Sequence, residues 1–156
     1  MSEHTVCVLV MIMDLMVQET SYGAGKGVYT KRDFIQGEEL FIFGTQVVTW
    51  AKTTHRSIQL GVNRWLEPPK NSFGWFLNHS CEPTAAFVLP NKIVALGLIR
   101  KGVEITIDYS TVVHTPRWEM ECWCQKQSCR KLLRSFQFLP ADLQGKYNHL
   151  RSFNKH

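Results

Sequence analysis

The stretch Asn78-His79-Ser80-Cys81-Glu82-Pro83 decides the fold of this chain, and it directly follows an aromatic and apolar run at residues 73–77. We expect the aromatic run to be buried, so the asparagine and the histidine should lie at the edge of the core. Buried polar side chains need hydrogen-bond partners. These two side chains therefore either satisfy neighbouring backbone groups or hold a ligand, and the stretch alone leaves both possibilities open.

Cysteines are the second informative feature, because three of them lie within residues 122–129. Four thiols form the donor set of a closed, tetrahedral zinc site of the structural kind. We predict such a site, in which the zinc ties the C-terminal segment to the segment around Asn78. The predicted ligands are Cys81, Cys122, Cys124 and Cys129. His114 and His79 are rival candidates for the fourth ligand.

The remaining cysteine, Cys7, lies in an apolar run at residues 6–13 that we expect to be a buried strand. A buried free cysteine behaves as a small hydrophobe. The run is far shorter than the about 20 residues of a transmembrane helix, and it lacks the basic region and cleavage site of a secretory signal. We therefore expect no membrane association, and a metal site in a reducing, intracellular compartment, cytoplasm or nucleus.

The 156 residues, 44% of them hydrophobic, suit one domain with its own core. Most of the chain reads as short strands separated by turn residues. The expected strands are 6–13, 27–30, 39–43, 46–50, 57–61, 85–89, 93–98 and 104–107. Near the end, Leu139, Leu143, Tyr147 and Leu150 share one face of a helix that Pro140 would begin. The fold class is therefore mostly β, with a terminal helix.

Two further motifs are weak when taken singly. Gly25-Lys26-Gly27 precedes a strand, where glycines allow a ligand to approach the backbone or simply allow a hairpin turn. Tyr109 ends an alternating strand at 103–107, which places a phenol at a strand end, either in a site or as an amphipathic rim residue. The formal charge of +5 is a mild excess and is too small to predict nucleic-acid binding.

In combination and in this order, the motifs resemble those of SET-domain protein lysine methyltransferases. Residues 25–28 resemble the family's Gly-x-Gly loop, 78–83 its Asn-His-Ser-Cys-x-Pro-Asn motif, 104–109 its Glu-Leu-x-x-Asp-Tyr motif and 122–129 its zinc-binding post-SET segment. The resemblance implies a SET fold of short curved sheets around a pseudoknot, with a zinc-tied C-terminal tail. It also implies a SET domain at 1–115, a post-SET zinc segment at 116–135 and a C-terminal helical extension at 136–156.

The resemblance implies methyl transfer from S-adenosylmethionine to a lysine of a protein substrate, with a structural zinc and no direct nucleic-acid contact. Tyr109 would be the tyrosine at the methyl-transfer centre, and Ile107 would line the lysine channel. The implied cofactor contacts are Gly25, Lys26, Gly27, Asn78, His79 and Trp123. Trp123, or an apolar residue such as Leu132, would cover the adenine, although simple packing of the tail is the alternative.

Some positions depart from the family's pattern. Trp75 stands where the motif usually has arginine, Thr84 follows the proline in place of asparagine, and residues 53–59 occupy the stretch of a second active-site tyrosine. These departures favour an alternative function, a catalytically quiet SET-like module that binds a protein. A zinc-stabilised nucleic-acid binder is a third reading. It rests on the basic residues Lys126, Arg130, Lys131 and Arg134.

Overall fold

The computed structural model describes residues 14–150, 152 and 153. Within that part, short strands form four small sheets, and the single α-helix is α2 (Ala141–Tyr147). Short 3-10 helices are formed by Trp50–Lys52, Gly74–Phe76, Tyr109–Thr111, Phe136–Phe138 and Asn148–Leu150. The expected strand at 6–13 and the cysteine within it lie outside the described residues. The structure is therefore mostly β, as the sequence predicts.

The central sheet has the order β1-β2-β10-β7. The strands are β1 (Leu15–Glu19), β2 (Lys26–Thr30), β10 (Glu104–Ile107) and β7 (Asn78–His79). β2 pairs antiparallel with both β1 and β10, whereas β7 runs parallel to β10 and places Asn78 opposite Thr106. The sheet thus brings the Asn-His stretch beside the strand that leads to the Asp-Tyr stretch, although the two are far apart in the sequence.

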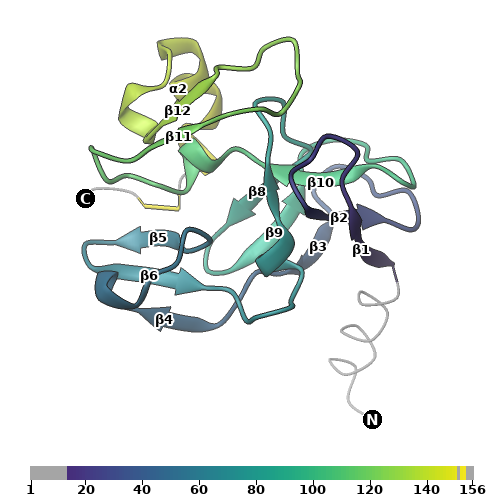
Figure 1. Cartoon of the computed structure of the whole chain (residues 1–156), viewed down its shortest axis with the longest axis horizontal. Coiled ribbons are helices and arrows are strands. Elements are labelled where there is room, and N and C mark those ends of the chain that lie inside the picture. The colour runs from purple at the N-terminus through teal and green to yellow at the C-terminus, as the bar shows by residue number, and fades with distance from the viewer. Residues whose placement is uncertain (1–13, 151, 154–156) are drawn as a thin grey trace.

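Two three-stranded antiparallel sheets complete the body of the molecule (Figure 1). One contains β3 (Glu39–Ile42), β9 (Lys92–Ala95) and β8 (Ala85–Val88), and the other contains β4 (Gln46–Val48), β6 (Arg64–Glu67) and β5 (Ile58–Gly61). Their buried side chains pack with those of β2 and β10 into one core. Fully buried members include Val28, Leu40, Phe43, Phe87, Ile93 and Ile105.

The C-terminal part forms a separate small layer, drawn green to yellow in Figure 1. β11 (Glu119–Glu121) and β12 (Leu132–Arg134) pair antiparallel, and α2 follows them. Leu133 packs against Cys81 and Cys122, which belong to a cluster distinct from the main core. Ser152 returns the chain to the body, because its backbone N–H donates to Thr111 O at 3.2 Å and its hydroxyl to Gln59 O at 2.6 Å.

Several expected elements have different limits in the structure. The strand expected at 46–50 ends at Val48 because the chain turns into a 3-10 helix at Trp50, and the strand expected at 93–98 ends at Ala95. The helix begins after Pro140, consistent with a proline that cannot donate a backbone hydrogen bond, and it becomes 3-10 at Asn148. In the part of the chain that the structure describes, no helix is long and apolar enough to cross a bilayer.

Candidate active site

Tyr109 lies between two hollows in the surface. One is a cleft of about 610 Å³ whose lining includes Gly25, Lys26, Asn78, His79 and Trp123. The other is a cavity of about 330 Å³ whose lining includes Phe43, Trp65, Ile107, Val113 and Trp118. Four residues line both: His55, Arg56, Leu77 and Tyr109. The two hollows therefore meet at Tyr109, and the cleft has the more polar lining of the two.

Hydrogen bonds between the two central motifs fix the position of Tyr109. Its hydroxyl donates to Leu77 O at 2.7 Å, and its backbone N–H donates to His79 Nδ1 at 3.1 Å. The backbone N–H of Ser80 donates in turn to Ile107 O at 3.0 Å. Burial raises the pKa of the Tyr109 phenol, so the group is a neutral hydroxyl. The arrangement holds this hydroxyl at the boundary between the cleft and the cavity.

Gly25 and Lys26 of the predicted glycine loop line one wall of the cleft, whereas Gly27 does not line it. Gly25 has a φ of +76°, a backbone conformation that residues with a side chain rarely adopt. Its carbonyl oxygen accepts a hydrogen bond from the backbone N–H of Thr20 at 2.7 Å and so closes the β1–β2 hairpin. Gly27 is buried, and a Cβ there would collide with the carboxylate of Glu104 and crowd the amide of Asn78. The first glycine thus makes a turn, and the second allows close approach of two polar side chains.

Asn78 is oriented by both of its amide hydrogens. Nδ2 donates to Lys26 O at 3.0 Å and to Glu104 Oε1 at 2.8 Å. Tyr22 also donates to the Glu104 carboxylate, at 3.0 Å and 2.9 Å, and burial together with this carboxylate raises the pKa of Tyr22. Because both amide hydrogens are used, the Oδ1 acceptor of Asn78 is the group left for a ligand. The sequence did not point to Tyr22, which has no periodic or motif signal.

The sequence between the glycine loop and Tyr109 decides the family. A family model of the SET domain matches residues 25–110, more than half of the chain. The chain belongs to the SET-domain family. Its central sheet and threaded Asn-His segment are therefore those of a SET fold. No curated protein sequence matches the chain at a significant level.

Solved structures agree with this assignment of the fold. KRYPTONITE, in a complex with mCHG DNA and SAH, superposes with a TM-score of 0.62 and 21% identity over 76% of this chain and 28% of its own. The methyltransferase domain of the human histone-lysine N-methyltransferase SETMAR gives a TM-score of 0.60 and 20% identity over 78% of this chain and 58% of its own. This chain thus spans about a quarter of the first structure and over half of the second.

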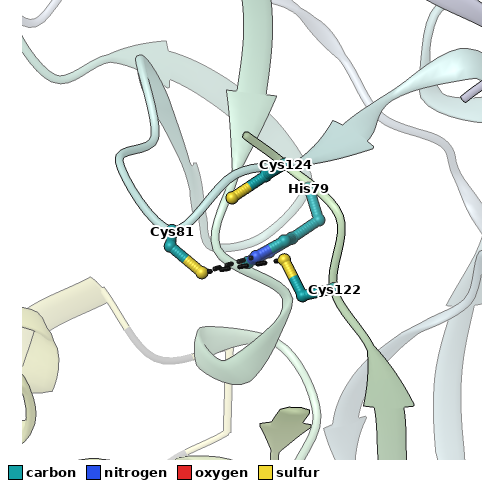
Figure 2. Close-up of side chains that lie close together, drawn as sticks. All are labelled: His79, Cys81, Cys122 and Cys124. Carbon is teal, nitrogen blue, oxygen red and sulfur yellow. Dashed lines mark hydrogen bonds between the residues drawn. The ribbon is translucent and has the colours of Figure 1, made fainter. Parts of the chain in front are cut away.

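A cluster of cysteine and histidine side chains lies between the SET domain and the C-terminal tail, where the resemblance implies zinc (Figure 2). Ligand atoms of His79, Cys81, Cys122 and Cys124 all lie within 4.8 Å of one another. Cys129 lies outside this group of four, but its Sγ is 3.7 Å from that of Cys122. Burial raises the pKa of the Cys81 thiol to about 11, so a nearby cation would be needed to hold it as a thiolate at neutral pH.

Distances between the sulfurs suit a tetrahedral metal. A zinc–sulfur bond of about 2.3 Å in a tetrahedron puts sulfur atoms about 3.8 Å apart. Cys81 Sγ is 3.8 Å from Cys122 Sγ, and Cys129 Sγ is 3.7 Å from Cys122 Sγ. No disulfide forms among these thiols, which are all free. The donor set therefore fits a zinc ion.

His79 is close enough to be a rival ligand, but its hydrogen bonds favour another role. Its Nδ1 accepts the backbone N–H of Tyr109, so in the neutral ring the proton is on Nε2. Burial lowers the pKa of His79 to about 4, which keeps the ring neutral. Nε2 lies 3.3 Å from Cys81 Sγ and is therefore placed to donate to that sulfur. The other rival, His114, packs between Phe136 and Phe153 and is not in the cluster.

A buried ion pair, which no sequence pattern predicts, joins the tail to the SET domain. Arg130 donates to both carboxylate oxygens of Asp108, at 2.8 Å and 2.6 Å, and to Ser110 Oγ at 3.1 Å. Its side chain is 14% exposed and that of Asp108 is 1% exposed. Arg134 likewise pairs with Glu119 at 2.9 Å. Two of the four basic residues behind the nucleic-acid reading are thus engaged within the chain, which weakens that reading.

The remaining predicted residues, Ile107 and Trp123, line different hollows. Ile107 is buried and lines the apolar cavity. Trp123 is 71% exposed and lines the cleft, whereas the alternative cover, Leu132, is 46% exposed and does not line it. Met120 and Glu121, which the sequence did not single out, line the cleft beside Trp123. The tail therefore forms the wall of the cleft that faces the glycine loop.

Proposed function

We propose that the chain transfers a methyl group from S-adenosylmethionine to a lysine side chain of a protein substrate. The observation behind this is the meeting of two hollows at Tyr109, one lined by polar groups of the SET motifs and one lined mainly by apolar side chains. Such a pair allows a cofactor and a lysine to approach one centre from opposite sides. Similarity in fold to a domain named as a histone-lysine methyltransferase, SETMAR, supports the same reaction class.

S-adenosylmethionine, when bound, supplies a methyl group on a sulfonium, and the protein has to present a neutral amine in line with it. A free lysine has a pKa of about 10.4, so little of it is neutral at pH 7. The aromatic and aliphatic walls around Ile107 disfavour an ammonium and so lower the pKa of an entering lysine. Holding two reactants in line supplies about 7–11 kcal/mol in favourable cases. Positioning is therefore the main task of these residues.

In this proposal Tyr109 orients the reacting groups. Its hydroxyl hydrogen is donated to Leu77 O, which leaves the oxygen lone pairs of a residue that lines both hollows to act as acceptors. A fixed oxygen there stabilises the positive charge on the methyl group during transfer. The Asn78 amide oxygen and the Gly25–Gly27 backbone would bind the amino-acid part of the cofactor, and Trp123 with His79 would border the adenine.

The proposed zinc ligands are Cys81, Cys122, Cys124 and Cys129. The ion would be structural, because four thiolates leave no open position. His79 would donate through Nε2–H to the Cys81 sulfur, and the backbone N–H of Arg130 donates to the same sulfur at 3.4 Å. Hydrogen bonds of this kind orient metal ligands. The zinc would hold the Met120–Cys124 wall of the cleft in place.

The test is incubation of the zinc-loaded protein with labelled S-adenosylmethionine and a panel of basic proteins, including histones and ribosomal proteins. We expect methylated lysine, located by mass spectrometry. Tyr109→Phe should keep cofactor affinity and lose turnover about 100-fold, because the hydroxyl acts mainly in the transition state. Parent-like methylation by this variant would remove Tyr109 from the centre.

The second candidate function is a catalytically quiet module that binds a protein tail. The departures at Trp75 and Thr84, and the absence of tyrosine from residues 53–59, favour it. Turnover separates the two functions. The module would be supported if the parent protein binds S-adenosylmethionine in calorimetry and binds the tail of one protein of the panel, but methylates none of them.

A further inference from the structure

Arg56 lies against Trp75, the residue at the position where the motif usually has arginine. Trp75 stands at that motif position, and its ring and carbonyl are both in contact with Arg56. The guanidinium carbon lies 4.1 Å from the centre of the indole ring, and Nε donates to Trp75 O at 2.9 Å. A planar guanidinium stacked on an indole is held at low cost in side-chain freedom. The cation is therefore present, but it comes from another segment of the chain.

The segment that presents Arg56 is itself fixed. It lies in the loop between β4 and β5, where Thr54 donates to Glu67 Oε1 at 2.7 Å and Ser57 donates to Glu67 Oε2. Within the described residues, only the Nε–H of Arg56 has a protein acceptor. The four N–H groups of its terminal nitrogens are left for a ligand. The half-buried side chain lines the cleft where it meets the cavity.

The charges that line the cleft indicate which ligand group the N–H groups of Arg56 bind. The amino-acid end of S-adenosylmethionine carries one ammonium and one carboxylate. The free Oδ1 of Asn78, with the Glu104 carboxylate behind its amide, suits the ammonium. The described cations that line the cleft are Arg56 and Lys26, and Lys26 is exposed with its Nζ 5.9 Å from the centre of the Phe76 ring. Arg56, stacked and partly desolvated, is the better partner for the carboxylate.

We propose that Arg56 binds the carboxylate of the methionine part of S-adenosylmethionine, with Trp75 as the platform that orients it. This assignment rests on the proposed function, since it places the same cofactor in the same cleft. Trp75 then replaces the usual arginine by supporting a cation from a neighbouring loop. The departure at this motif position is a relocation of the charge within the site and leaves cofactor binding intact.

Calorimetry with two ligands isolates the contact. Decarboxylated S-adenosylmethionine keeps the sulfonium and the amine and lacks only the carboxylate. The zinc-loaded parent should bind S-adenosylmethionine more tightly than this analogue. Arg56→Gln should weaken S-adenosylmethionine binding about 10- to 100-fold, which is the range for a hydrogen bond to a charged group. The affinity for the analogue should stay within about twofold of that of the parent. Arg64→Gln, an exposed arginine on β6, is the matched control and should change neither affinity.

Each other outcome overturns the assignment. Equal losses for both ligands would show that Arg56 only shapes the cleft wall, and an unchanged affinity would show that it faces the protein substrate. A selective loss in Lys26→Gln, without one in Arg56→Gln, would move the carboxylate to Lys26. Should Arg56→Gln fail to fold, Arg56→Lys must show a smaller loss for S-adenosylmethionine alone. A parent that binds neither ligand would overturn the proposed function, and this assignment with it.

Discussion

The polar cleft and the apolar cavity share Tyr109 but are built from different parts of the chain. The cavity is lined by residues of the main core, such as Phe43, Trp65 and Ile107, which are held by packing between sheets. The cleft is lined by the β1–β2 turn and by the tail around Cys122 and Trp123. Core packing is insensitive to metal, whereas the tail is held to the SET domain by the cysteine cluster, the Arg130–Asp108 ion pair and a few hydrogen bonds. The proposed cofactor side of the centre should therefore be lost more easily than the proposed lysine side.

Removing one sulfur ligand should break the cleft and spare the cavity, and this is the largest effect we expect. Cys124→Ser should lower the zinc content sharply and weaken S-adenosylmethionine binding by more than about 100-fold, because the wall of the cleft formed by the tail loses its metal cross-link. The β-core should stay folded by circular dichroism. Cys7→Ser, a thiol outside the proposed set, is the control and should keep its zinc. X-ray absorption showing a nitrogen ligand would contradict the four-cysteine set.

Crowding the turn should damage the cleft in a more graded way. Gly27→Ala forces the new Cβ against Glu104 and Asn78, and overpacking of this kind costs typically about 1–3 kcal/mol. We expect cofactor affinity to fall about 10-fold, with a lower melting temperature. Gly145→Ala, in α2 with open space around it, is the comparison and should be neutral or stabilising. Wild-type affinity in the Gly27 variant would place the cofactor elsewhere.

A change in the cavity should alter the product and leave cofactor binding unchanged. Ile107 lines the cavity two residues before Tyr109 and offers no hydroxyl to hold an amine in one orientation. We therefore expect di- or trimethyllysine from the parent, measured by mass spectrometry at long reaction times. Ile107→Tyr should shift the product towards monomethyllysine, with S-adenosylmethionine affinity within about twofold. A parent product that stops at monomethyl, unchanged in the variant, would show that the position has no influence.

Strands with clear alternation were predictable, and short strands without it were not. The expected 104–107 matches β10, and 85–89 and 39–43 are each one residue too long. β6 was missed because it has only two apolar residues, which lie between the charged Arg64 and Glu67. β7 was missed because a strand of two residues is too short to show an alternating pattern. β11 and β12 were missed as well. Their pairing depends on each other and on the cysteine cluster, which local pattern does not report.

The motif residues of the site were predictable because each is a fixed type at a fixed position, as with Asn78 and Tyr109. Arg56, Tyr22 and Arg130 were not, since their roles depend on partners 19, 82 and 22 positions away in the sequence. Arg130 even belonged to a basic run that suggested a solvated face. Composition and residue spacing report local patterns, so they cannot identify residues whose roles depend on long-range contacts.

The parallel pairing of β7 with β10, together with the antiparallel pairing of β10 with β2, sets an order for folding. β2 can pair with β1 as soon as both are made, because a short turn joins them. The Asn-His segment, in contrast, has no strand partner until β10 has been synthesised. Non-local pairing of this kind slows folding. The two halves of the reaction centre should therefore come together late on the ribosome, and zinc should enter last, after the final cysteine has emerged.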